Sequence, residues 1–165
     1  MMGTRPGSVD VGILLQLQRE HGLALEELDR ALNHSSGLLG ISGVASNLVQ
    51  IETAAAQGNE RARLAFDMFA DCVRSAIGAL AATLGGVDAV TFTDRVGEHS
   101  VALRAAACEG LEFMGLRLDP ERNADPQADT DVAKPDSPAR ILVIHTQEEL
   151  VVAREACRVV SSGAR

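Results

Sequence analysis

Aromatic residues are rare in this sequence, whose 165 residues include four phenylalanines and neither tryptophan nor tyrosine. Proteins that bind single-stranded nucleic acids stack the bases on aromatic side chains, so the chain nearly lacks that platform. The formal net charge of −8 also disfavours a broad surface for nucleic acid or for an anionic membrane. We therefore expect the chain to bind neither nucleic acids nor membranes.

Long apolar runs are missing as well. No stretch of about 18 apolar residues occurs, so the sequence predicts no membrane-spanning helix. The first seven residues lack the apolar core of a signal peptide, which makes the cytoplasm the expected location. With 46% hydrophobic and 23% charged residues, residues 1–165 have the composition of one globular domain with a sizeable core.

Cysteine and histidine are few and have no metal-binding spacing. The three cysteines, Cys72, Cys108 and Cys157, form no CxxC pair, and an odd number cannot form a complete set of disulfides. We expect them to be buried, reduced thiols. The four histidines show no HxxxH spacing, and no GxSxG sequence is present. Local motifs therefore indicate neither a zinc site nor a serine nucleophile.

Helical periodicity dominates the first half of the chain. A helix is predicted to begin after Asp10, which is placed to cap it, and the longest predicted helix covers residues 59–84. Shorter helices are predicted over residues 25–32 and 46–56. Three glycines in residues 36–43 are too many for a helix interior, so a loop or short extended piece is expected there. An apolar stripe on the longest helix is predicted to face the core or another helix. Its members are Ala65, Phe69, Cys72, Ala76 and Leu80.

The second half contains two strand–loop–helix units. Residues 89–93 form an apolar, β-branched run that leads through a loop around Gly97 into a helical pattern over residues 101–113. The run at residues 141–144 leads into the last predicted helix. Between them, residues 119–140 are polar and are expected to form a surface excursion, after a brief strand near residue 116. Two such units predict an α/β fold with a parallel or mixed sheet covered by helices.

The junction after Thr93 is the first candidate site. Open α/β sheets bind ligands just outside the carboxyl ends of their strands, and helix-start amides can face a phosphate. A plain strand–helix connection has the same pattern, and by itself it is the simpler interpretation. One glycine at such a junction therefore indicates a nucleotide site only weakly.

Three residues near the second junction have distinct expectations. Thr146 and Glu149 have the spacing of a capping box, so Glu149 is expected to cap the last helix. Glu148 has no such role, and a carboxylate there is suited to hold Mg²⁺ together with phosphate oxygens. The alternative for Glu148 is a first-turn acid favoured by the helix dipole.

Six segments resemble, in order, motifs of the acetate kinase family. Residues 36–43, SGLLGISG, match a family signature outright, and residues 2–7, MGTRPG, are similar to its MGTR(S/C)G segment. Residues 92–99 align with FTGGIGEN, and residues 144–150 with IPTNEEL. The other two segments are residues 58–62 and 110–115. The likeness runs along almost the whole chain and corresponds to the C-terminal half of the family's proteins.

The resemblance implies an actin-like ATPase (acetate and sugar kinase) fold, of which this chain is the nucleotide-binding half. It implies interconversion of ATP plus acetate with ADP plus acetyl phosphate, using Mg²⁺. Arg5 is the implied catalytic arginine, which stabilises the transferring phosphoryl group, and Glu148 is the implied Mg²⁺ carboxylate. Homodimerisation through this half is implied as well. The implied nucleotide contacts are Asn47, Val49, Asp94, Arg95, Val96, Gly97, Glu98 and His99.

The chain also departs from the family's pattern. Asp94 and Arg95 replace paired glycines, and His99 replaces an asparagine. An Asp-x-Arg contact falls on Asn47-Leu48-Val49, and His145 replaces a proline. The N-terminal domain, with the short-chain carboxylate pocket, is expected to be absent. Two hypotheses follow. In the first, the chain is the nucleotide half of the kinase and is inactive alone, and its expected partner is a second copy in a homodimer or a separate N-terminal half. In the second, it is a degenerate, non-catalytic module for dimerisation or partner binding.

Overall fold

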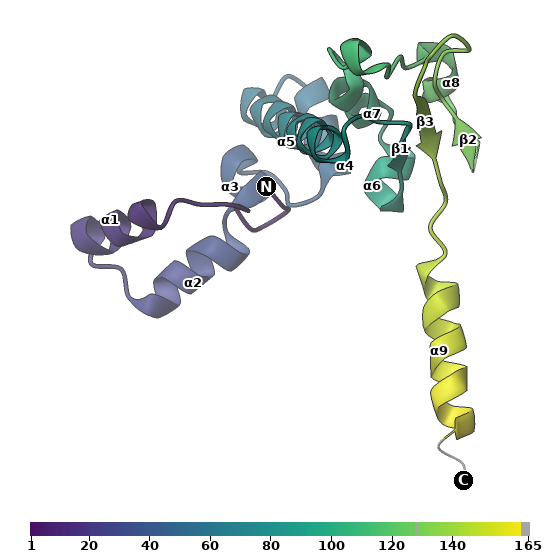
Figure 1. Cartoon of the computed structure of the whole chain (residues 1–165). Helices are drawn as coiled ribbons and strands as arrows, with labels where there is room; N and C mark the ends of the chain where they lie inside the picture. Colours follow the sequence, from purple (N-terminus) through teal and green to yellow (C-terminus); the bar gives the residue numbers. More distant parts are fainter. Residues whose placement is uncertain (128, 163–165) are drawn as a thin grey trace. The chain divides into compact units, whose positions relative to one another are not determined.

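The computed structural model describes residues 1–127 and 129–162 (Figure 1). The chain divides into two compact units, and each is described separately. The first comprises residues 1–86 and 105–109, and the second comprises residues 87–104 and 110–165. The expectation of a single domain over residues 1–165 stays a prediction. Within the described residues, no helix combines the length and apolar character needed to cross a membrane.

The first unit is helical, and two of its helices begin at residues whose side chains cap them, the predicted cap Asp10 and also Asn59. Asp10 and Asn59 accept hydrogen bonds from the amides of Gly12 and Ala62, at 2.6 and 2.9 Å. Both α3 and α4 pack against α5, whose first half buries Ala62 and Ala65. The helices are α1 (Val11–His21), α2 (Leu25–His34), α3 (Gly37–Ser42), α4 (Leu48–Ala56) and α5 (Glu60–Leu84).

The loop predicted over residues 36–43 is wrong, because six of these residues form helix α3. Gly43 ends the helix in the left-handed conformation, with φ of +68°. Gly37 begins it with φ of +62°, and a Cβ atom there would collide with the carbonyl oxygens of Met2 and Arg5. These glycines therefore lie at the ends of the helix, where they permit positive φ and a close approach of the N-terminal segment.

Part of the predicted apolar stripe on α5 is exposed. Ala65 is buried and Phe69 is half-buried, but Cys72, Ala76 and Leu80 are exposed, with Leu80 at 62% of its area. This face of the second half of α5 is therefore exposed in the described chain, whereas Ala81 on the same helix is buried. The three cysteines are free thiols as expected, but only Cys108 among them is buried, since Cys72 and Cys157 are exposed.

The second unit is built on a mixed three-stranded sheet. Its strands have the order β1-β3-β2, with β1 parallel and β2 antiparallel to β3 (Figure 1). The strands are β1 (Ala89–Phe92), β2 (Thr130–Asp131) and β3 (Arg140–Val143). The helical segments are α6 (Asp94–His99), α7 (Val101–Cys108), η1 (Glu112–Met114), α8 (Pro120–Ala124) and α9 (Glu148–Ser162); the residues of α7 from Ala105 belong to the first unit.

The polar segment of residues 119–140 is more than a surface excursion. It contains α8 and β2, and it buries Val132, Ala133 and Ala139 completely or almost so. The brief strand expected near Leu116 is reduced to single bridges on either side of Arg117, to Ala139 and to Ala133. Sequence polarity misleads here because these three apolar residues are buried within an otherwise polar segment. Strand β1 lies at the edge of the sheet, and of its four residues only Phe92 is buried.

Candidate functional site

A hollow of about 460 Å³ lies in the second unit, beyond the carboxyl ends of the parallel strands β1 and β3. It is formed by α6, by the residues after β3 and by the first turn of α9. This is the edge at which the sheet rule predicts a ligand site. The lining residues are Asp94, Arg95, Glu98, His99, His145, Thr146, Gln147, Glu148, Glu149 and Leu150.

The segment predicted as a loop around Gly97 is the short helix α6. Gly97 is buried, and a Cβ atom there would lie 3.1 Å from the carbonyl carbon of Phe92. A glycine therefore allows α6 to pack directly against the end of β1. Asp94 has φ of +63°, a conformation that glycine adopts freely and aspartate tolerates better than most residues. The aspartate thus keeps a glycine-like backbone at this turn.

Thr146 connects the two strand ends. Its hydroxyl donates to Glu98 Oε1 at 2.6 Å, and its amide donates to the same oxygen at 2.9 Å. The Thr146 Oγ1 atom also accepts from the amide of Asp94 at 2.9 Å. The predicted capping box of Thr146 with Glu149 is therefore wrong, because α9 begins at Glu148 and the hydroxyl is engaged by α6. The hydrogen bond from the Asp94 amide to Thr146 Oγ1 also occupies one of the helix-start amides that were expected to face a phosphate.

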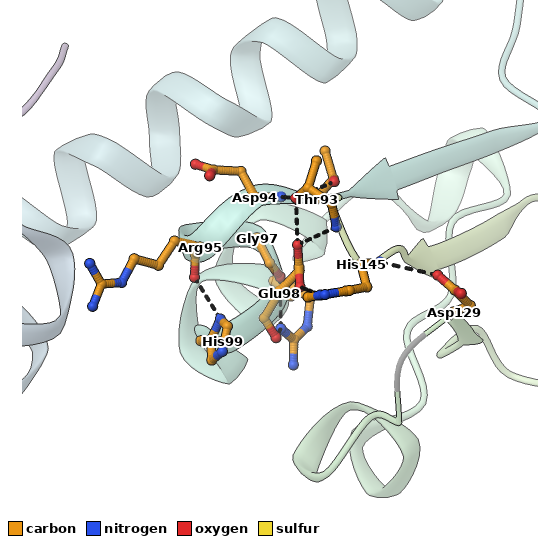
Figure 2. A network of polar contacts seen from close by, with 10 residues as sticks. Thr93, Asp94, Arg95, Gly97, Glu98, His99, Asp129 and His145 are labelled. Atoms are coloured by element: carbon orange, nitrogen blue, oxygen red, sulfur yellow. Dashed lines mark hydrogen bonds and ion pairs between the residues drawn. The ribbon is translucent and has the colours of Figure 1, made fainter. Parts of the chain in front are cut away.

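Glu98 and His145 form the charged centre of this network (Figure 2). His145 Nδ1 lies 2.7 Å from Glu98 Oε2, and the Glu98 side chain is only 12% exposed. Hydrogen bonds from the Thr146 hydroxyl and amide, and from His145, lower the pKa of Glu98 to about 2. The hydrogen bond to Glu98 and its negative charge raise the pKa of His145, and Asp129 adds to the effect. Both groups are therefore charged in mildly acidic solution.

Beneath α6 lies a buried arginine that sequence analysis missed. The guanidinium of Arg104 is fully buried and donates to the carbonyl oxygens of Gly97 and Glu98, both at 2.8 Å. It also donates to Asn123 Oδ1 at 2.7 Å. These bonds satisfy the carbonyl groups at the end of α6. No local pattern marks Arg104, since the helix it lies on contains mostly small apolar residues.

Glu148 faces the hollow with an exposed carboxylate. Neither a hydrogen bond nor an ion pair joins it to the rest of the described chain. Asp94, Arg95 and Glu149 are also exposed at the hollow, and Arg95 points away from Glu98 and His145 in Figure 2. Over residues 1–127 and 129–162, no group of three or more acidic, histidine or cysteine side chains is placed to hold a metal ion. The single exposed carboxylate of Glu148 fits a cation that takes one carboxylate and completes its shell with phosphate oxygens and water, as Mg²⁺ does.

The other predicted site residues belong to the first unit. Arg5 lines a separate hollow of about 550 Å³ near the N-terminus, together with Leu14 and Leu32. Asn47 caps α4, its Oδ1 accepting from the Gln50 amide at 2.9 Å. Val49 is 60% exposed on the same helix. The hollow therefore brings together Asp94, Arg95, Glu98, His99 and Glu148, whereas Val96 and the buried Gly97 do not line it. The convergence of Arg5, Asn47 and Val49 on that hollow stays a prediction.

Comparison with known proteins gives consistent matches along the chain. The model of the Acetokinase family matches residues 1–154. The acetate kinase of Rippkaea orientalis is 49% identical over 157 residues, which are 95% of this chain and 39% of that protein. The acetate kinase of Trichormus variabilis is 49% identical over 161 residues, or 98% of this chain and 40% of that protein. The chain thus spans about two fifths of the length of these relatives.

Solved structures confirm the expected fold. A Porphyromonas gingivalis acetate kinase matches with a TM-score of 0.88 and 39% identity, over 97% of this chain and 40% of that one. A Francisella tularensis propionate kinase matches with a TM-score of 0.84 and 31% identity, over 93% and 39%. The α/β architecture, with a mixed sheet flanked by helices, is that of the actin-like ATPases. From the family match and these relatives, the chain belongs to the acetokinase family.

Proposed function

We propose that this chain supplies the nucleotide-binding part of an acetate kinase-type phosphotransferase, which interconverts ATP plus acetate with ADP plus acetyl phosphate. The part corresponds to the C-terminal half of the family. The observation that carries the proposal is the hollow at the carboxyl ends of β1 and β3, which residues of α6 line together with the exposed carboxylate of Glu148. In this proposal, residues other than these 165 form the rest of the cleft, including the site for the short-chain carboxylate.

The charges of the hollow favour a nucleotide accompanied by a cation. Four carboxylates line it, and Arg95 is the arginine among the lining residues. Metal-free ATP is therefore repelled, and we expect Glu148 to hold Mg²⁺ that bridges and neutralises the phosphate oxygens. Arg5 is proposed as the fixed cation that stabilises charge on the transferring phosphoryl group.

Calorimetric titration of the chain with Mg·ATP tests this proposal. We expect binding at millimolar or tighter affinity, and at least a fivefold loss of affinity for Glu148→Ala, on the scale of one charge-assisted contact. Glu121→Ala is the matched control, because Glu121 is also an exposed first-turn acid of the second unit but lies outside the hollow. Absence of binding, or equal affinity of the two variants, would contradict the proposal.

A non-catalytic module is the second candidate, and two observations favour it. Side chains of Asp94 and Arg95 stand at the hollow where the family motif has glycines. Leu64 and Met68, four residues apart on α5, are both exposed and offer apolar side chains to a second copy of the chain. Sedimentation analysis of the oligomeric state, combined with the Mg·ATP titration, distinguishes the non-catalytic module from the kinase. A stable homodimer that binds no Mg·ATP would favour the module, whereas a nucleotide-binding chain in any oligomeric state favours the kinase.

A further inference from the structure

We propose that Glu98 is a positioning residue, which fixes residues 144–147, and through them Glu148, at the hollow. His145 makes this positioning depend on pH. The inference rests on the proposed function and deepens it, since it concerns regulation of the same site. It assigns Glu98 a role in shaping the hollow rather than in contacting the nucleotide.

The oxygens of Glu98 are already engaged within the protein. Oε1 accepts two hydrogen bonds from Thr146, at 2.6 and 2.9 Å, and Oε2 faces His145 Nδ1 at 2.7 Å. A carboxylate held by three donors and only 12% exposed has little capacity left for a ligand. By contrast, the carboxylate of Glu148, two residues after Thr146, is exposed in the hollow.

The donor and acceptor roles around Thr146 follow from its single hydroxyl proton. A carboxylate with a low pKa only accepts, so the Thr146 hydroxyl donates to Glu98. Thr146 Oγ1 then accepts from the Asp94 amide, and also from the Thr93 hydroxyl, which lies 3.2 Å away. One side chain thereby couples the end of β1, helix α6 and the start of α9. We expect loss of the Glu98 contact to loosen the coupling of Thr146 to α6, while the backbone bond from the Ile144 amide to the Phe92 carbonyl still joins the two strand ends.

His145 adds a proton-dependent contact to this coupling. Its ring faces Glu98 on α6, and its backbone amide donates to Asp129 Oδ1 at 3.1 Å, from the segment before β2. The other charged groups of the hollow are Asp94, Arg95, His99, Glu148 and Glu149. Neutral imidazole with a proton on Nδ1 still donates to Glu98, but the ion pair is lost. Because Glu98 raises the pKa of His145, the ion pair between the two side chains is fully formed below pH 6.5. It weakens as pH rises through the raised pKa of His145.

Nuclear magnetic resonance titration of His145 and calorimetry with Mg·ATP from pH 5 to 8 test the inference together. We expect His145 to titrate above 6.5 in the native chain and to shift back toward 6.5 in Glu98→Gln. Affinity for Mg·ATP should fall across the same pH interval, and His145→Gln should flatten that profile. His21→Gln, at the end of α1 in the first unit, controls for unrelated histidine titration.

Substitutions at Thr146 separate positioning from a direct charge effect. Thr146→Val keeps both charges and the side-chain shape, but it removes the hydroxyl; we expect about fivefold weaker Mg·ATP binding, the equivalent of one ordinary hydrogen bond. Thr146→Ser restores the hydroxyl and should restore affinity. Equal affinities of these two variants, or a His145 titration that Glu98→Gln leaves unchanged, would overturn the inference.

Amide hydrogen exchange provides a readout that does not need the nucleotide. Protection of the amides of Asp94, Thr146 and the first turn of α9 should fall in Thr146→Val and recover in Thr146→Ser. If the native chain binds no Mg·ATP while these exchange and titration results hold, the proposed function fails and the positioning role stands. Unchanged protection in Thr146→Val would overturn the positioning role itself.

Discussion

Asp94 is a residue whose backbone and side chain act separately. Its φ of +63° favours glycine, while its carboxylate adds negative charge to the hollow. We expect the free energy of unfolding of Asp94→Ala, measured with urea, to be about 1 kcal/mol lower than that of Asp94→Gly, because alanine is strained at positive φ. Both variants remove the same charge, so a gain in Mg·ATP affinity should appear equally in the two. Equal stability of the two variants would show that the turn is not strained.

Glu98 makes the stability of the second unit depend on acid. Its folded pKa of about 2 lies below the ordinary value of 4.5, so its contribution is present above pH 4.5 and is lost as pH falls toward 2. We expect the native chain to lose more stability between pH 6 and pH 3 than Glu98→Gln does. Urea unfolding at both pH values measures the difference, with Glu121→Gln as the control. Parallel losses in all three proteins would contradict the assignment.

The sequence predicted some residues of the hollow and missed others for physical reasons. The sheet rule marked the junction after Thr93 as a candidate site, and the family resemblance implied residues 94–99 and Glu148 as its members. The Thr146–Glu149 capping box failed because Glu98, 48 positions away, accepts from the Thr146 amide and the Asp94 amide donates to the Thr146 hydroxyl oxygen. No local rule detects such distant partners. Arg104 was missed because its acceptors are backbone carbonyl groups and Asn123, which leave no sequence signature.

At the scale of single elements, α3 gives a matched test of glycine geometry. Gly37 and Gly43 have nearly the same φ, +62° and +68°, but only a Cβ atom at Gly37 would meet backbone atoms. Gly43→Ala should cost about 1 kcal/mol for its left-handed conformation. Gly37→Ala should cost a further 1–3 kcal/mol, as is typical of overpacking, because the Met2 and Arg5 carbonyl oxygens must move. Chemical denaturation measures the free energy of unfolding of both variants. Equal losses of stability would contradict the close approach of the N-terminal segment to Gly37.

Elements defined by local signals were predicted well, and those defined by distant contacts were not. Helices α1, α4 and α5 begin beside Asp10, Asn47 and Asn59, which are good capping residues. The polar segment of residues 119–140 was misjudged because its structure depends on partners elsewhere, such as the Ser137 hydroxyl bonded to the Gly115 carbonyl. Helix α3 was misjudged because Gly37 and Gly43 lie at its two ends rather than in its interior, and Gly37 is required by the close approach of the N-terminal segment.

For the whole molecule, the chain spans about two fifths of its relatives' length. We therefore expect these 165 residues alone to position the nucleotide but not the carboxylate acceptor. Phosphoryl transfer depends on holding both reactants, so acetate-dependent turnover should be undetectable. A hydroxamate assay for acetyl phosphate measures it, with a full-length acetate kinase as the positive control. Robust acetate-dependent product formation by this chain would contradict the expectation.

The central claim is that the hollow at the ends of β1 and β3 binds a magnesium-bound nucleotide. The most direct measurement is a two-dimensional nitrogen–proton spectrum of the chain during titration with Mg·ATP. Our account predicts saturable shifts at the amides of residues 94–99 and 146–150, which are strongly reduced in Glu148→Ala. No shifts at saturating Mg·ATP, or shifts confined to other residues, would contradict it.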